Sequence, residues 1–174
     1  MSQDSPSPRQ TGKWMMAAAW IIGMLLLTQL FGFWEDQQRN PNQTLRIVSG
    51  ADGNEELVLQ RNRFGHYLFT GKINNRDVEF LVDTGATVVA VPESMARSLG
   101  LPELGQTSMQ TANGTTRATR TVIDQLQLGP FTLRDVNATI LPRMNGDQEV
   151  LLGMSALRHL SFSQQGDQLI LRAE

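Results

Sequence analysis

The chain has 174 residues, of which 40% are hydrophobic and 18% charged, a balance typical of a folded domain rather than a disordered chain. Its 15 basic and 17 acidic residues give a formal net charge of −2, which removes the electrostatic argument for a nucleic-acid partner. The chain has no cysteine, so disulfide scaffolds, cysteine-ligated metals and thiol catalysis are excluded. With only two histidines, we expect no metal site and no cofactor, and any catalysis must rest mainly on carboxylates, hydroxyls, lysine or arginine.

An uncharged apolar stretch covers residues 14–34. As a helix it would be about 31 Å long, which matches the hydrocarbon core of a bilayer. Trp14 stands at one end, and Phe33 and Trp34 stand at the other, as aromatic residues do at membrane interfaces. The stretch therefore predicts one transmembrane helix, and its unbroken apolar character disfavours the alternative of a buried core helix.

The charges around this stretch predict its orientation. Arg9 and Lys13 precede it, and two acids follow it directly. The positive-inside tendency places residues 1–13 in the cytoplasm and the rest of the chain across the membrane. A cleaved signal peptide is the alternative, but no small-residue cleavage site follows the apolar run. We therefore expect an uncleaved signal anchor, which in a bacterium would hold a periplasmic domain on the inner membrane.

Beyond the anchor the pattern predicts a mainly β domain. Residues 35–63 are expected to form a tether and the leading strands, and residues 64–174 a single compact domain. Two short helices are expected at Pro92–Leu99 and Ser155–His159. Short runs rich in strand-forming residues, separated by turn residues, predict these strands: Leu45–Val48, Leu57–Gln60, His66–Lys72, Asp77–Val82, Gln106–Thr111, Thr115–Gln127, Phe131–Leu141, Val150–Leu152, Ser161–Gln164 and Gln168–Arg172.

The most informative segment is FLVDTGATVVAVP, which begins at Phe80. An apolar strand runs into Asp83-Thr84-Gly85, which places a carboxylate at the edge of a core and follows it with a residue that permits a tight turn. A plain strand-to-turn transition is the alternative interpretation, because all three are turn residues. A second apolar run begins at Val150 and ends in Gly153, within the segment VLLGMSAL, and it favours a functional interpretation.

These segments resemble the active-site region of the retropepsin-like aspartic proteases. The segment at Asp83 is similar to their catalytic loop, and VLLGMSAL to the element that closes the same half of the fold. The stretch TSMQTANGTTRATR, from Thr107, resembles their flap hairpin. The match covers roughly residues 64–172, and with the apolar helix it resembles bacterial, membrane-anchored, single-domain members. The resemblance implies a retropepsin-like half-barrel, mainly β, with a flap hairpin.

The resemblance also implies a mechanism in which two carboxylates share one proton and activate a water molecule. This chain has one Asp-Thr-Gly segment, and Asp124, Asp135, Asp147 and Asp167 lack that continuation. The second carboxylate must therefore come from another copy, which predicts a symmetric homodimer with both Asp83 side chains at the axis. Activity is expected to be highest at acidic pH, because the pair must retain one proton.

Further roles follow from the same resemblance. The implied catalytic residues are Asp83, Thr84 and Gly85, with the two Thr84 hydroxyls interlocking beneath the carboxylates. An extended polypeptide substrate would bind as an added strand. The residues expected to hold it come from the loop and from the flap: Ala86, Thr87, Ala112, Asn113 and Gly114.

Other candidates for chemistry are weaker. His66 and His159 stand in no metal-ligand pattern, and Ser94 and Ser155 lack the Gly-x-Ser-x-Gly setting of a serine nucleophile. Two function classes remain open at this point. One is a membrane-anchored aspartic endopeptidase, and the other is a catalytically silent domain of the same fold that binds extended peptides or scaffolds a partner.

Overall fold

The computed structural model describes residues 8–50, 53–111, 114–142, 144 and 149–173. It divides into two compact units, one up to residue 38 and one from Arg39 to the C-terminus. The first contains the long helix α1, and the second contains all the strands and the helices α2 and α3. Each unit is described by itself below.

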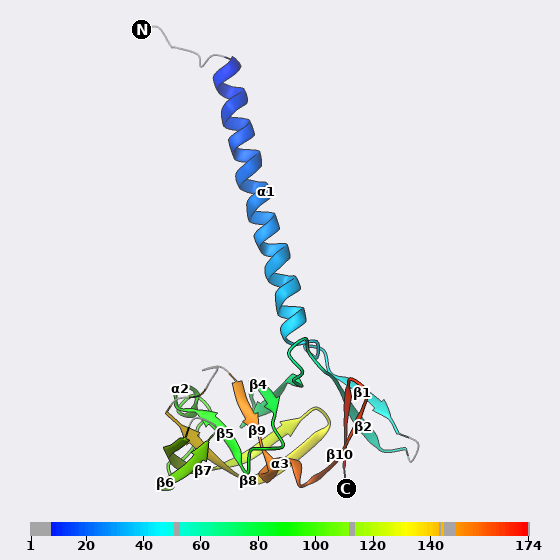
Figure 1. Ribbon diagram of the computed structural model, residues 1–174, viewed down its shortest axis with the longest axis vertical. Helices are drawn as coiled ribbons and strands as arrows, with labels where there is room; N and C mark the ends of the chain where they lie inside the picture. The colour runs from blue at the N-terminus through cyan, green and yellow to red at the C-terminus, as the bar shows by residue number, and fades with distance from the viewer. Residues whose placement is uncertain (1–7, 51–52, 112–113, 143, 145–148, 174) are drawn as a thin grey trace. The chain divides into compact units, whose positions relative to one another are not determined.

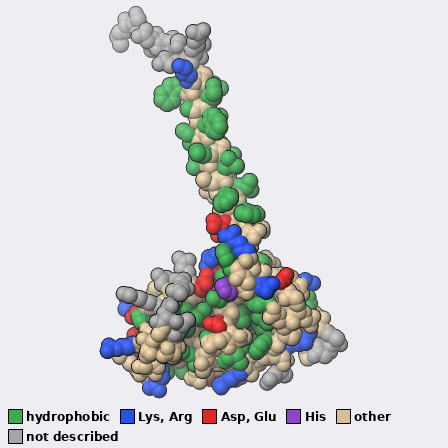
Figure 2. Space-filling model, viewed as in Figure 1, with side chains coloured by type: hydrophobic (Ala, Val, Ile, Leu, Met, Phe, Trp, Pro, Cys, Tyr) green, Lys and Arg blue, Asp and Glu red, His purple; other side chains and the backbone are tan. Residues whose placement is uncertain are grey.

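Helix α1 covers Pro8–Arg39. Between Gly12 and Arg39 it is long and apolar enough to cross a membrane, and the most apolar part of this stretch has no buried residue. Its apolar side chains lie open along the helix surface (Figure 2). The helix continues beyond the expected end at Trp34, because the acidic and amide residues that follow do not break a helix.

The second unit is built from eleven strands in two sheets (Figure 1). The short helices α2 (Glu93–Ala96) and α3 (Met154–Leu157) each follow a strand. The strands are β1 (Arg46–Ser49), β2 (Glu55–Gln60), β3 (Leu68–Ile73), β4 (Arg76–Val82), β5 (Val89–Pro92), β6 (Gln106–Thr111), β7 (Gly114–Leu128), β8 (Phe131–Leu141), β9 (Glu149–Leu152), β10 (Leu160–Gln165) and β11 (Gln168–Ala173). The expected mainly β fold with short helices is confirmed, and β5 is a strand that the sequence pattern did not separate from the loop before it.

The larger sheet has the order β3-β4-β9-β5-β8-β7-β6. An additional pairing of β3 with β7, at Lys72↔Gln127 and Ile73↔Leu126, curls this sheet back on itself. Its centre contains two parallel pairs, β4 with β9 and β5 with β8. The smaller sheet, β1-β2-β11-β10, is antiparallel throughout and lies to one side of the larger one (Figure 1).

The core lies between these strands because their apolar residues alternate with polar ones. In β4, Val78 and Phe80 are buried, whereas Asp77 is exposed and Glu79 is only partly buried. The rings of Phe69 and Phe80 pack against each other with centroids 5.6 Å apart. This packing fixes β4 firmly up to its last residue, from which the loop of interest departs.

Within residues 35–63, which were expected to form a tether and the leading strands, the residues from 39 onward are bonded to the domain. The Arg39 guanidinium lies 2.7 Å from both Glu79 on β4 and Glu149 on β9. Asn40 donates to Glu79, and the buried Asn42 side chain bonds to backbone groups of Gln60 and Leu68 at the ends of β2 and β3. Amide side chains satisfy several backbone groups at once, which is why a polar sequence is buried here.

Candidate active site

Asp83 lies directly after β4, where two backbone hydrogen bonds fix the chain. The Val82 N–H donates to the Tyr67 carbonyl at 3.0 Å, and the Asp83 N–H donates to the Leu152 carbonyl at 3.1 Å. These bonds continue the parallel pairing of Val82 with Leu152. The position of the Asp83 backbone is therefore set by strands on both sides and not by the loop itself.

A tight turn presents the Asp83 carboxylate. The Ala86 N–H donates to the Asp83 carbonyl at 3.2 Å, and the Gly85 N–H donates to the Asp83 carboxylate oxygen Oδ1 at 2.9 Å. A Cβ on Gly85 would stand 3.2 Å from that oxygen. The glycine thus lets the backbone come close enough to orient the carboxylate.

The other polar groups of the loop face outward. Asp83 is half-buried, and Thr84, Gly85 and Thr87 are exposed. In the described part of the chain, no cation pairs with Asp83 and the Thr84 hydroxyl makes no hydrogen bond. The loop therefore presents the Asp83 carboxylate and the hydroxyl of the next residue, Thr84, to solvent or to another molecule.

Gly153 packs closely against the backbone of the loop. A Cβ on Gly153 would stand 2.7 Å from the Ala86 carbonyl oxygen and closer still to that of Val88, so only glycine fits here. The next two residues donate backbone N–H groups to the loop, Met154 to Ala86 at 2.8 Å and Ser155 to Thr87 at 3.0 Å. These donors open α3 and have no partner within the helix, so the loop carbonyls satisfy them.

The Ser155 hydroxyl joins the loop to the sheet, and the residue is buried, with 6% of its surface exposed. It donates to the Asn137 carbonyl on β8 at 2.7 Å and accepts the Val89 N–H at 3.0 Å. Ser155 is thus a structural contact at the end of the loop and not a nucleophile. Its role was not visible in the sequence, because no local pattern marks a buried serine as a bridge between strands.

The expected hairpin is formed by β6 and β7, paired from Gln106↔Thr119 to Thr111↔Gly114. Gly114 has a positive φ of 104°. Ala112 and Asn113, also expected to bind substrate, lie outside the described residues. Gly114 is paired with Thr111 across the hairpin.

A small apolar cluster joins the hairpin to the strands beside the loop. Ala118 of β7 is buried with Ala90 of β5 and Leu141 of β8, and the partly buried Met109 of β6 and Leu151 of β9 pack against them. Ala90 and Leu151 are paired in the sheet. The hairpin is therefore packed through apolar side chains against the strands that flank the Asp83 loop.

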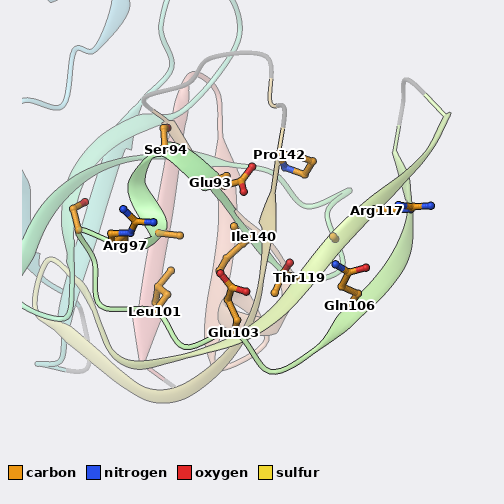
Figure 3. Close-up of a pocket in the computed structure, with 13 residues that line it drawn as sticks. Glu93, Ser94, Arg97, Leu101, Glu103, Gln106, Arg117, Thr119, Ile140 and Pro142 are labelled. Carbon is orange, nitrogen blue, oxygen red and sulfur yellow. The ribbon is translucent and has the colours of Figure 1, made fainter.

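A separate cavity of about 710 Å³ lies between α2 and the base of the hairpin (Figure 3). None of the residues 83–87 lines it. Its labelled side chains include Glu93 and Glu103 as well as Arg97 and Arg117, with Leu101 and Ile140 among the apolar ones. Because the lining mixes acidic, basic and apolar side chains, it indicates no single class of ligand.

Comparisons with known proteins agree with this geometry. The model of the family described as "gag-polyprotein putative aspartyl protease" matches residues 69–159, which contain the Asp83 loop, the hairpin and α3. The chain belongs to this family.

Related proteins extend the match over most of the chain. An uncharacterized protein in the cobV 5′ region of Sinorhizobium sp. is 30% identical over 167 residues, covering 89% of this chain and 71% of that protein. Uncharacterized protein RP867 of Rickettsia prowazekii (strain Madrid E) is 31% identical over 121 residues, covering 67% and 51%.

Among solved structures, a retropepsin-like aspartic protease from Rickettsia conorii superposes with a TM-score of 0.60. It is 29% identical and the match covers 75% of this chain and 96% of that one. The expected retropepsin-like fold is therefore confirmed. The roles expected for Asp83, Thr84, Gly85, Ala86 and Thr87 stay predictions.

The two histidines differ in their relation to this site, because His66 directly precedes Tyr67, whose carbonyl accepts the N–H of Val82, the residue before Asp83. His66 and His159 are exposed and stand on different elements, one before β3 and the other after α3. Among the residues that the structure describes, no group of three metal-ligating side chains comes together.

Proposed function

We propose that this protein is a membrane-anchored aspartic endopeptidase that acts as a homodimer. The single observation that carries the proposal is the half-buried Asp83 carboxylate, held by the Gly85 N–H at the end of β4 and paired with no cation in the described part of the chain. The family, whose members are described as aspartyl proteases, supports the same activity.

In the proposed mechanism, the Asp83 carboxylates of two protomers share one proton. The charged member takes a proton from a water molecule while the water oxygen attacks the carbonyl carbon of the scissile peptide bond, and the protonated member donates its proton to the carbonyl oxygen. The C–N bond of the resulting tetrahedral intermediate then breaks as the newly protonated carboxyl gives its proton to the leaving amine nitrogen and the other carboxylate takes a proton back from a hydroxyl of the intermediate. Thr84 of each protomer orients the pair, and Gly85 allows the backbone to support the carboxylate.

The substrate in this proposal is an extended polypeptide. It lies across Ala86 and Thr87, and the hairpin tip at Ala112, Asn113 and Gly114 covers it. The exposed side chains of the loop support this placement, and so does the apolar cluster of Met109 and Leu151, which packs the hairpin against the strands beside the loop. Backbone hydrogen bonds from both sides would hold the substrate as an added strand.

The membrane part of the proposal rests on α1. Residues 14–34 cross the bilayer as an uncleaved anchor, with the N-terminus in the cytoplasm and the catalytic domain in the bacterial periplasm. The length and apolar surface of α1 support the span, and the basic residues before it support the orientation. The test of orientation is labelling of a single introduced cysteine at Gln164, which is exposed, by an impermeant maleimide in intact spheroplasts.

The test of the activity is Asp83→Asn in the full chain, reconstituted in vesicles and given a fluorescently labelled unfolded polypeptide. Removal of the catalytic carboxylates should lower cleavage by about 10²–10⁴-fold or more. Asp124→Asn is the matched control, because Asp124 is an exposed acid outside the Asp-Thr-Gly segment. Cleavage that survives Asp83→Asn would refute the proposed mechanism, and retained peptide binding without cleavage in the wild-type chain would favour a silent binding domain.

A further inference from the structure

The loop between β2 and β3, residues 61–66, carries an unusually exposed aromatic ring. Phe64 is 59% exposed, which exceeds the exposure of Leu104, Phe162 and every other large apolar side chain described beyond residue 38. The guanidinium carbon of Arg63 lies 4.7 Å from the centre of the Phe64 ring. An apolar face and a positive charge are thus presented together.

The exposure of Phe64 is built into the loop. The Asn62 side-chain oxygen accepts the N–H groups of Phe64 and His66, both at 2.9 Å. The Asn62 backbone N–H donates to the His66 carbonyl at 2.8 Å, and Gly65 turns the chain with a φ of 86°. Since Asn62 itself is buried, the loop is pinned at its base and the ring is held outward.

The same asparagine also bonds to Arg39, the first residue of the second unit. The Asn62 Nδ2 donates to the Arg39 carbonyl at 2.8 Å, and the Arg39 side chain is in turn bonded to Glu79 and Glu149. Only four residues separate Arg39 from Trp34, the last residue of the apolar stretch. In any conformation, a linker of this length reaches no further than about 18 Å.

From this connection we infer that the loop at residues 61–66 is a phospholipid-binding surface. The Phe64 ring enters the headgroup layer. The inference rests on the proposed membrane anchoring, because the bond from Asn62 to Arg39 brings the loop within reach of the bilayer only if residues 14–34 span it. Aromatic rings favour the membrane interface.

The charges near the loop do not make a broad basic patch. Arg61 is paired with Asp167, His66 is exposed, and Glu35 and Asp36 precede Arg39 in the chain. The proposed contact therefore depends on the apolar ring of Phe64. A solitary exposed phenylalanine is otherwise unremarkable on a protein surface, and the connection to Arg39 is what distinguishes this one.

The test uses the absence of natural cysteines in the full chain. Single cysteines at His66, Leu104 or Leu26 are labelled with an environment-sensitive fluorophore, and each chain is reconstituted in vesicles of phosphatidylcholine and phosphatidylglycerol. The vesicles carry nitroxide quenchers on a fraction of the headgroups or acyl chains. His66 reports on the loop with Phe64 intact, Leu104 is an exposed apolar control on another loop, and Leu26 reports on the span.

We expect the headgroup nitroxide to quench the His66 probe, the acyl-chain nitroxide to quench the Leu26 probe, and neither to quench the Leu104 probe strongly. Phe64→Ser should reduce the quenching at His66 toward the level seen at Leu104, whereas Phe162→Ser should leave it unchanged. A quenched Leu26 probe with an unquenched His66 probe, or with His66 quenching that is insensitive to Phe64→Ser, overturns the lipid contact and leaves the anchor intact. An unquenched Leu26 probe overturns the anchoring itself.

Discussion

Gly153 lies so close to Val88 that a Cβ on Gly153 would stand 2.4 Å from the Val88 carbonyl oxygen. The atom in the way is backbone, so no side-chain rotation can relieve the contact. Gly153→Ala should therefore lower the free energy of unfolding by about 3 kcal/mol or more and shift the loop that carries Asp83. Chemical denaturation followed by near-ultraviolet circular dichroism measures the loss.

Gly166→Ala is the matched control for this change. Gly166 has a φ of 59°, but no atom lies within 4 Å of a Cβ placed there, so alanine is strained without a clash. Its cost should be about 1–2 kcal/mol. Equal losses in the two variants would mean that the approach of Gly153 to the loop does not constrain the site.

A second prediction concerns the Ser155 hydroxyl, which bonds to both Asn137 and Val89. Ser155→Ala leaves a backbone carbonyl and a backbone N–H without partners in a buried place. The expected loss of stability is about 1–3 kcal/mol, measured by urea titration. Ser98→Ala, which removes an exposed hydroxyl bonded to Met95, should change the stability by less than about 0.5 kcal/mol. If both serine variants behave alike, the bridge from Ser155 contributes nothing.

The strands and the candidate loop could be predicted from the sequence for a common reason. β6 and β8 were predicted with their observed bounds, Gln106–Thr111 and Phe131–Leu141, because strand-forming residues bounded by turn residues leave a local pattern. The Asp83 loop was found because its three residue types follow one another directly. In each case the information lies in neighbouring residues.

The supports of the loop could not be predicted, because they join residues distant in the chain. Ser155 meets Val89 across 66 positions, and Arg39 meets Glu149 across 110. Residues 35–63 were expected to form a tether and the leading strands, and nothing in the sequence marks the asparagines that are buried, since buried and solvated asparagines look alike in a sequence. Only the fold shows that Asn42 satisfies backbone groups of two strands.

A third prediction concerns Arg39, whose guanidinium lies between Glu79 and Glu149, direct partners in the parallel pairing of β4 with β9. Arg39→Ala should cost about 1–2 kcal/mol, because it leaves two like charges side by side on adjacent strands. Adding Glu149→Gln to Arg39→Ala should restore part of that loss. Thermal unfolding of the single and double variants measures this coupling.

Lys72→Ala is the control for Arg39. Lys72 and Arg39 have similarly exposed side chains, at 42% and 43%, but Asp77 beside Lys72 is 69% exposed whereas Glu149 is 18% exposed. Removing Lys72 should therefore cost well under about 1 kcal/mol. If Glu149→Gln fails to recover any stability in the Arg39→Ala background, repulsion between the two glutamates is not the cause of the loss.

The last prediction separates a shared site from independent protomers. If each active dimer needs Asp83 from both chains, co-expressed wild-type and Asp83→Asn chains form inactive mixed dimers. At constant total protein, replacing half the chains should lower cleavage to about one quarter of the wild-type rate, because random pairing leaves that fraction of fully wild-type dimers. Independent protomers would retain about one half, and Asp124→Asn chains mixed in the same way should leave the rate unchanged. The cleavage rate should follow the square of the wild-type fraction, and a linear dependence would show that one Asp83 is enough.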